Sequence, residues 1–307
     1  MMLQDLRLVV LCALVVGLAG CSASPRRTAH TLPERPREAV RIFDRQGNST
    51  AWEVMRGEVS QADVIVIGES HGHPLGLEAA ACLWDDILET EPDAALLLEF
   101  FERDEQVALD DYLTGVTDEE EFRKASGRTS GNYPPGHERM VEAAKTFGRP
   151  VIAANAPRRY VQRTTSEGYE KLDELGPEQK RLFVVPDQLV EGRYRDDFFE
   201  LMSGGHGEDG GLPEEMIEKF YRSQQMWDAT MADSVVRAVR EGYRPVVLVV
   251  GRFHSDLDGG TIQMIRRQQP DLTIRTLSMV ATDAETIDEE DVGRADFVLY
   301  VGAAPEN

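Results

Sequence analysis

Short apolar runs alternate with stretches of helical spacing along residues 40–307. Each run has the length of one strand and is bounded by turn residues. This alternation predicts parallel strands joined by helices. The expected strands are 64–67, 94–98, 151–154, 246–250, 272–277 and 297–301. We therefore expect an α/β fold with a mostly parallel sheet flanked by helices.

Apolar side chains recur at helical spacing between the expected strands, as at Leu75, Ala79 and Leu83. A stripe of this kind covers one face of a sheet. Two longer ranges, about 101–148 and 158–242, are mostly helical in pattern and exceed what a simple strand–helix alternation needs. We expect these helical insertions to form a smaller helical subdomain over one edge of the sheet, within one α/β domain that spans 40–307.

The first residues of the chain have the pattern of a secretory signal. An apolar run over 8–18 is too short to span a bilayer as a helix, and it ends in Leu18-Ala19-Gly20-Cys21. That ending resembles a bacterial lipobox. It predicts a signal peptide over 1–20 and attachment of diacylglycerol and palmitate at Cys21. The alternative is an ordinary signal peptide in which Cys21 stands by chance.

Residues 21–39 are rich in Ser, Pro and Arg and show no apolar periodicity. This composition is typical of a flexible tether, so we expect the folded part to begin near Val40. Lipoproteins with serine after the cysteine, as at Ser22, resemble those that are sent to an outer membrane. We therefore expect a lipid anchor at the cell envelope, on the periplasmic face of the outer membrane.

Cysteine content and charge narrow the function further. Cys82 is the one thiol that remains after Cys12 is removed and Cys21 is lipidated, so no internal disulfide can form. The net charge is −22, and a surface with such an excess of carboxylates repels phosphate backbones. Nucleic-acid binding is therefore disfavoured.

Charged and amide side chains follow four of the expected strands. In an open parallel sheet, ligands bind where the carboxyl ends of the strands meet. The residues at these ends are Glu69, His71, Glu99, Asn155, Arg158, Arg252 and His254. We expect them to converge on one binding site. The alternative is a structural network, in which His71 caps a helix and Arg252 pairs with Glu69.

A second polar group lies on the long helical pattern that begins after Pro213. Tyr221, Gln225 and Asp228 are spaced at i, i+4 and i+7, so they share one helix face. A stripe of this composition is unusual for a core, and we interpret it as a ligand-binding face. The alternative is a helix that forms hydrogen bonds across a subdomain boundary.

Five segments in order carry a resemblance to a known family. They are Gly68-Glu69-Ser70-His71, 98–106, 154–158, 220–232 and 251–254. On these segments the chain resembles the ChaN-like haem-binding lipoproteins of the haem-uptake and Tiki superfamily.

The resemblance implies a parallel sheet with a small helical domain, and it implies haem or iron handling at the cell surface, with a homodimer as a candidate assembly. In a member of the family, tyrosine ligates haem iron, which is chemically reasonable for ferric iron. Tyr221 is the first candidate, and Tyr194 and His206 are the alternatives. Arg158 or Arg252 would then lie near the haem propionates.

The same superfamily contains erythromycin esterases and Tiki-type metalloproteases, so a hydrolase is the alternative function. In that hypothesis, His71 or Glu69 activates water, and Glu99 and His254 complete the site. A divalent metal is compatible with these residues, although the sequence lacks the His-Glu-x-x-His pattern that is typical of zinc. A haem site needs an apolar slot, whereas a hydrolase needs a compact polar pocket.

Overall fold

The structure is a computed structural model that describes residues 32–204 and 211–304. The signal peptide, Cys21 and His206 lie outside these residues. No described helix combines the length and the apolar composition needed to cross a membrane. The free thiol of Cys82 is buried.

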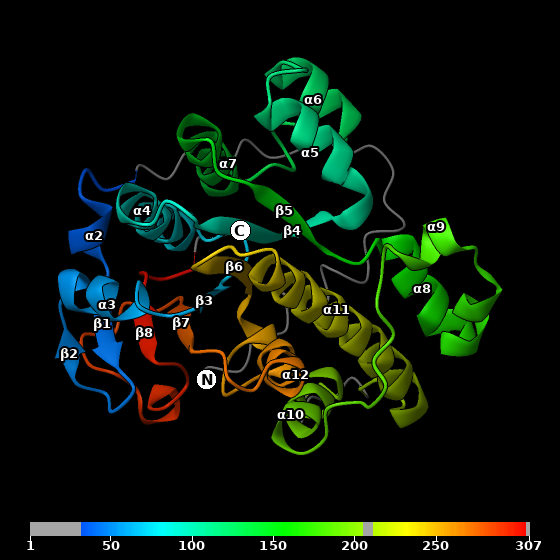
Figure 1. The fold of residues 1–307 in the computed structure, drawn as a ribbon. Helices are drawn as coiled ribbons and strands as arrows, with labels where there is room; N and C mark the ends of the chain where they lie inside the picture. Colours follow the sequence, from blue (N-terminus) through cyan, green and yellow to red (C-terminus); the bar gives the residue numbers. More distant parts are fainter. Residues whose placement is uncertain (1–31, 205–210, 305–307) are drawn as a thin grey trace.

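One eight-stranded sheet forms the centre of the described chain, in the order β2-β1-β8-β7-β3-β6-β4-β5 (Figure 1). Strands β8, β7, β3, β6, β4 and β5 run parallel to one another, whereas β1 and β2 are antiparallel additions beside β8. The strands are β1 (Arg41–Asp44), β2 (Ser49–Thr50), β3 (Val64–Glu69), β4 (Ala95–Glu102), β5 (Val151–Asn155), β6 (Val246–Gly251), β7 (Ile274–Val280) and β8 (Phe297–Tyr300). The predicted fold class is confirmed.

Helices lie on both faces of the sheet and at its ends. The α-helices are α2 (Pro36–Ala39), α3 (Trp52–Val59), α4 (Pro74–Thr90), α5 (Gln106–Leu113), α6 (Glu119–Ala125), α7 (Pro135–Phe147), α8 (Arg158–Glu167), α9 (Pro177–Lys180), α10 (Arg193–Met202), α11 (Glu214–Arg240) and α12 (Gly260–Gln268). The short 3-10 helices are η1 (Arg103–Glu105), η2 (Tyr169–Glu174), η3 (Arg252–His254) and η4 (Glu289–Asp291).

The side chains of each central strand alternate between two cores, as the pleat of a strand requires. In β3, Ile65 and Ile67 face the layer of α4 and α7, while Val64 and Val66 face the layer of α11 and α12. Figure 1 shows these helix pairs on opposite sides of the sheet. Helices α7 and α11 fall inside the two expected helical insertions, but they cover the sheet faces instead of standing over an edge.

The smaller helical unit consists of α8, η2 and α9 and packs against α11 (Figure 1). It has its own apolar cluster, in which Tyr160, Val161 and Leu172 pack with Phe183 and with Met226 of α11. This unit corresponds to the expected subdomain, although it is smaller than the predicted range.

Ordered structure begins before Val40. Helix α2 packs on α4, and Arg37 Nη2 lies 2.7 Å from Asp86 Oδ1. The indole of Trp52 donates a hydrogen bond of 2.7 Å to the other oxygen of the same carboxylate. Asp86 therefore holds the end of the expected tether against helix α4.

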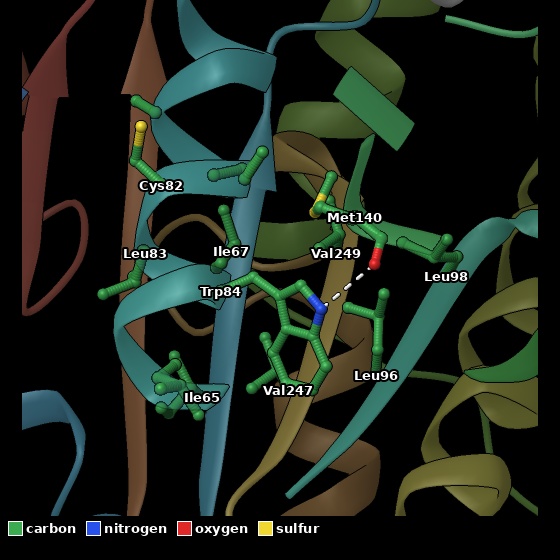
Figure 2. Packing of buried hydrophobic residues seen from close by; sticks show 14 of the residues in the cluster. Ile65, Ile67, Cys82, Leu83, Trp84, Leu96, Leu98, Met140, Val247 and Val249 are labelled. Carbon is green, nitrogen blue, oxygen red and sulfur yellow. Dashed lines mark hydrogen bonds between the residues drawn. The ribbon is translucent and has the colours of Figure 1, made fainter. Parts of the chain in front are cut away.

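Trp84 is the largest fully buried side chain of the described core. Figure 2 shows it between α4 and the sheet, against Leu96, Val247 and Val249. Its Nε1 donates a hydrogen bond of 3.1 Å to the carbonyl of Met140 in α7. Trp84 therefore joins both helices of this layer to the strands.

We expect Trp84→Ala to lower the free energy of unfolding by about 3–5 kcal/mol, because it removes a large buried ring and leaves a cavity. Urea unfolding followed by circular dichroism measures the change. Val107→Ala is the matched control, because Val107 is 69% exposed and its loss should cost less than about 0.5 kcal/mol. Equal losses in the two variants would contradict this description of the core.

Candidate functional site

The carboxyl ends of β3, β6 and β4 bring the candidate site together. These three strands are adjacent and parallel, so their ends meet at one edge of the sheet. Glu69 ends β3 opposite Gly251, the last residue of β6. Glu99 does not end its strand as expected, because β4 continues to Glu102 through an irregular register that begins after Leu98. Glu99 therefore lies within β4, at the point where the register becomes irregular, and still reaches the end of the sheet where β3 and β6 stop.

The carboxylate of Glu69 is buried between two imidazole rings. Its Oε1 lies 2.8 Å from Nδ1 of His71, and its Oε2 lies 2.7 Å from Nε2 of His137. Burial opposes the negative charge, but the two rings outweigh burial and hold the pKa of Glu69 well below its usual range. The site therefore contains an ionised carboxylate beneath its surface.

His137 comes from the first turn of α7 and was not among the predicted site residues. It reaches Glu69 because α7 lies very close to α4 at Gly136, where a Cβ atom would come within 2.5 Å of the Cβ of Leu77. The sequence gives only an indirect signal that His137 belongs to the site, because glycine and histidine are common at the start of a helical pattern. Only the packing of two helices gives this histidine its partner.

Of the two histidines that contact Glu69, His71 is the exposed one, with a side chain that is 46% exposed. Desolvation lowers the pKa of its ring, but the hydrogen bond to Glu69 and the charges of Glu99 and Glu69 raise it to about 9. The ring also packs against Gly251, where a Cβ atom would lie 2.5 Å from Nε2 of His71. Glycine at this position is therefore needed for the observed ring position.

A second buried carboxylate, Asp228 of α11, lies on the other face of the sheet. It accepts hydrogen bonds from the hydroxyl of Tyr194 (2.7 Å), from Oγ1 of Thr261 (2.6 Å) and from Nε2 of Gln225 (3.3 Å). It also lies against the first turn of α12, where a Cβ on Gly260 would come within 2.3 Å of Oδ2. Donors and the helix dipole together stabilise a negative charge here.

His254 links this second carboxylate to the strand ends. Its Nδ1 lies 2.8 Å from Asp228 Oδ1, and its Nε2 lies 3.7 Å from Glu99 Oε1. Gln224 Nε2 adds a contact of 3.2 Å to Nδ1. Burial lowers the pKa of His254, but the charges of Asp228 and Glu99 outweigh burial, and the net shift is upward.

Glu99 therefore lies between two imidazoles that approach from opposite faces of the sheet. Its Oε2 accepts a hydrogen bond of 2.5 Å from the backbone N–H of Gly251, which fixes the carboxylate. The charge of Glu99 raises the pKa of both His71 and His254. We name Glu69, His71, Glu99, Asp228 and His254 the strand-end cluster.

Asn155, Arg158 and Arg252 occupy other places at the same end of the sheet. The side chain of Asn155 accepts a hydrogen bond from the next backbone N–H, at 2.9 Å. Arg158 lies near Glu102, where burial raises the pKa of the carboxyl and the arginine lowers it, with a net upward shift. Arg252 does not pair with Glu69: its ion-pair partner is Asp256 at 3.5 Å.

The polar stripe on α11 points into the protein. Tyr221 is fully buried, and its hydroxyl donates a hydrogen bond to the carbonyl of Val190. Gln225 accepts a hydrogen bond of 2.6 Å from the N–H of the same residue. Burial, followed by the charge of Asp228, raises the pKa of Tyr221 and of Tyr194 well above the usual phenol value. Both phenols are therefore neutral at ordinary pH.

No group of three or more His, Cys, Asp or Glu side chains within 32–204 and 211–304 has the geometry to hold a metal ion. The expectation of a divalent metal therefore has no support in this part of the chain. In the strand-end cluster, Nδ1 of His71 is hydrogen-bonded to Glu69 and Nδ1 of His254 to Asp228. The described residues provide no hydrogen-bond partner for Nε2 of His71.

The pKa of His71 makes the stability of the fold depend on pH. A ring whose pKa rises from 6.5 to about 9 on folding stabilises the fold fully below pH 6.5, and this contribution is lost as the pH rises to about 9. We expect His71→Gln to be less stable than the native chain at about pH 6, with a difference that shrinks by about pH 9. Urea unfolding at both pH values tests this, and a difference that does not change with pH would contradict the assigned shift.

Comparison with known proteins agrees with this architecture. A profile described as "Haem-binding uptake, Tiki superfamily, ChaN" matches residues 55–265 of the 307. No curated protein matches the sequence.

Among solved structures, one that reports cofacial haem binding to ChaN of Campylobacter jejuni has a TM-score of 0.65 and 20% identity, with 85% of this chain and 96% of that chain covered. A protein of Bacillus cereus has a TM-score of 0.48 and 9% identity, with 82% and 91% covered. An erythromycin esterase in its open conformation has a TM-score of 0.45 and 13% identity, with 78% and 76% covered. The first of these likenesses shows a common fold, and the profile covers more than half of the sequence. The chain therefore belongs to the haem-binding uptake family of the Tiki superfamily that includes ChaN.

Proposed function

We propose that this chain is a haem-binding lipoprotein of the cell envelope that takes part in iron uptake. The family profile over 55–265 is the observation that carries the proposal. It includes both halves of the strand-end cluster, from Glu69 to His254. Haem iron is held in proteins by histidine, cysteine, methionine or tyrosine, and the cluster contains imidazoles of this kind.

The strand-end cluster holds its one partly exposed imidazole, His71, in a fixed orientation. Glu69 fixes the orientation of the His71 ring through Nδ1, and His137 fixes Glu69 from the other side. Bound haem would supply a ferric centre that accepts a protein ligand. The chain's own contribution is a rigid ring at the surface, carried by a buried carboxylate.

The lipobox-like sequence at residues 18–21 supports a place at the envelope. Leu18-Ala19-Gly20-Cys21 has the pattern of a lipobox, and Ser22 favours export to the outer membrane. Haem captured there would be held next to the membrane across which it is transported. The anchor and the cluster are thus parts of one proposal, in which the tether keeps the binding domain at the membrane surface.

A hydrolase is the second candidate, because Glu99 lies between two carboxylate-supported imidazoles. The neighbouring carboxylates raise the pKa of both rings, to about 9 for His71, and so favour the protonated forms, which would act as acids or stabilise an anion. Glu99 would then be the group that accepts a proton from water. This arrangement favours hydrolysis of an ester or amide whose tetrahedral intermediate carries a negative charge.

The purified full chain in mild detergent should bind hemin to a defined saturation ratio. Difference absorption during a hemin titration measures this, because bound haem has a shifted Soret band whose growth stops at saturation. A linear rise without saturation would mean nonspecific association and would contradict haem binding. The hydrolase would then be tested by the loss of ester hydrolysis in His254→Ala with the circular dichroism spectrum retained.

Cys21→Ser should prevent lipidation, because serine lacks the thiol that is alkylated. The expected result is an uncleaved precursor or a soluble protein, detected by cell fractionation and by the loss of labelled palmitate incorporation. Cys82→Ser is the matched control, because it changes a buried thiol within the folded domain and should leave labelling intact. Membrane retention and labelling of the Cys21 variant at the native level would overturn the anchor.

A further inference from the structure

All eight tyrosines of this chain lie within the described residues. Tyrosine ligates ferric haem through its deprotonated oxygen, so a phenol that serves as a ligand must be reachable and able to ionise. Six of the eight side chains are buried: Tyr112, Tyr133, Tyr160, Tyr194, Tyr221 and Tyr300. The partly exposed pair is Tyr169, whose hydroxyl donates to the carbonyl of Arg222 at 2.6 Å, and Tyr243, which lies just before β6 at the opposite end of the sheet from the strand-end cluster.

Tyr221, the first candidate for an iron ligand, is enclosed by α10. Phe198 and Phe199 of that helix pack on its ring, with centroids 5.2 and 6.0 Å away. Its hydroxyl donates to the carbonyl of Val190. An iron bond to this phenol would require α10 to leave α11, and it would leave the carbonyl of Val190 without its donor, which is unfavourable.

Tyr194, the second candidate, joins α10 to α11. Its hydroxyl donates to the buried carboxylate of Asp228 at 2.7 Å and accepts from Nε2 of Gln224 at 3.0 Å. Its ring packs on that of Phe253, with centroids 5.1 Å apart. Ligation by Tyr194 would remove a hydrogen bond from a buried charge, which costs more than the loss of a bond between neutral groups.

Neighbouring carboxylates oppose the ionisation of other buried phenols as well. Burial, followed by the hydrogen bond and the charge of Glu142, raises the pKa of Tyr112. The hydroxyl of Tyr133 has no hydrogen-bond partner within the described chain, but burial and the charges of Glu138 and Glu142 raise its pKa too. A phenol in such surroundings keeps its proton, because a negative charge is disfavoured both by burial and by carboxylates nearby. The unpartnered hydroxyl of Tyr133 therefore does not fit an iron ligand either.

We infer that no tyrosine of this chain ligates haem iron, and that Tyr194 and Tyr221 instead hold α10 against α11. The inference rests on the proposed haem-binding function and concerns the coordination of the iron. It corrects the expectation that Tyr221 or Tyr194 binds the iron, and it departs from the tyrosine ligation that the family resemblance implies. This chain thus has the fold of its family without that ligand.

Resonance Raman spectroscopy of the hemin complex tests the coordination. The full chain is prepared in mild detergent with ordinary and with ring-deuterated tyrosine. A phenolate bound to ferric iron contributes tyrosine vibrations that deuteration shifts, and labelling reaches all eight phenols without a substitution. We expect the same spectrum from both samples. Vibrations that shift on deuteration would overturn this inference alone, whereas hemin binding that does not saturate would overturn the proposed function.

Urea unfolding without hemin tests the structural role of the two phenols separately. Tyr194→Phe and Tyr221→Phe each remove one buried hydroxyl and keep the ring, so each should lower the urea midpoint. Tyr243→Phe is the matched control, because it removes the same atoms from a partly exposed side chain and should keep the native midpoint. Native midpoints for Tyr194→Phe and Tyr221→Phe would show that the phenols do not hold α10, and the inference would fail even for a chain that binds no hemin.

Discussion

The site depends on the burial of two carboxylates, Glu69 and Asp228, at one end of the sheet. A buried charge is costly unless it is paired and hydrogen-bonded, and each carboxylate meets this condition through donors from other elements. Glu69 is hydrogen-bonded to the loop after β3 and to the first turn of α7. Asp228 is hydrogen-bonded to α10, α12 and η3. Removing either carboxylate would leave cationic or polar partners unpaired in the interior, at a cost on the order of 3–5 kcal/mol.

This requirement explains the geometry at the strand ends. His71 and His254 each place one ring nitrogen on a buried carboxylate. The fold therefore sets the orientation of each ring, and with it the position of the second nitrogen. His254 is enclosed and faces Glu99, whereas His71 stands at the surface. The same chemistry on the two faces of the sheet thus gives one enclosed imidazole and one that is partly exposed.

The sequence predicted the parts of this site that follow apolar runs. Glu69, Glu99 and His254 were recognised because strand ends meet at one edge, and β3 and β6 have the expected positions. His137 could not be recognised, because its role comes from the approach of α7 to α4 at Gly136. The pattern of residues along the chain does not show how closely α7 approaches α4.

Other differences also arise from tertiary contacts. The polar face of α11 with Tyr221 was recognised correctly as a face, but the sequence could not show that α10 covers it and supplies Tyr194 to Asp228. Arg252 was considered as a partner of Glu69, yet it lies near Asp256, four residues along the same turn. Strands β1 and β2 escaped prediction because they are very short: β1 gains its pairing from β8, and β2 pairs only with β1.

The most direct test of the account is equilibrium dialysis of the full chain, in mild detergent, against hemin, with bound haem measured by absorption. The account predicts binding that saturates at a fixed ratio of haem to protein, because the chain belongs to a haem-binding family. Binding that rises in proportion to the hemin concentration without saturation would contradict the central claim.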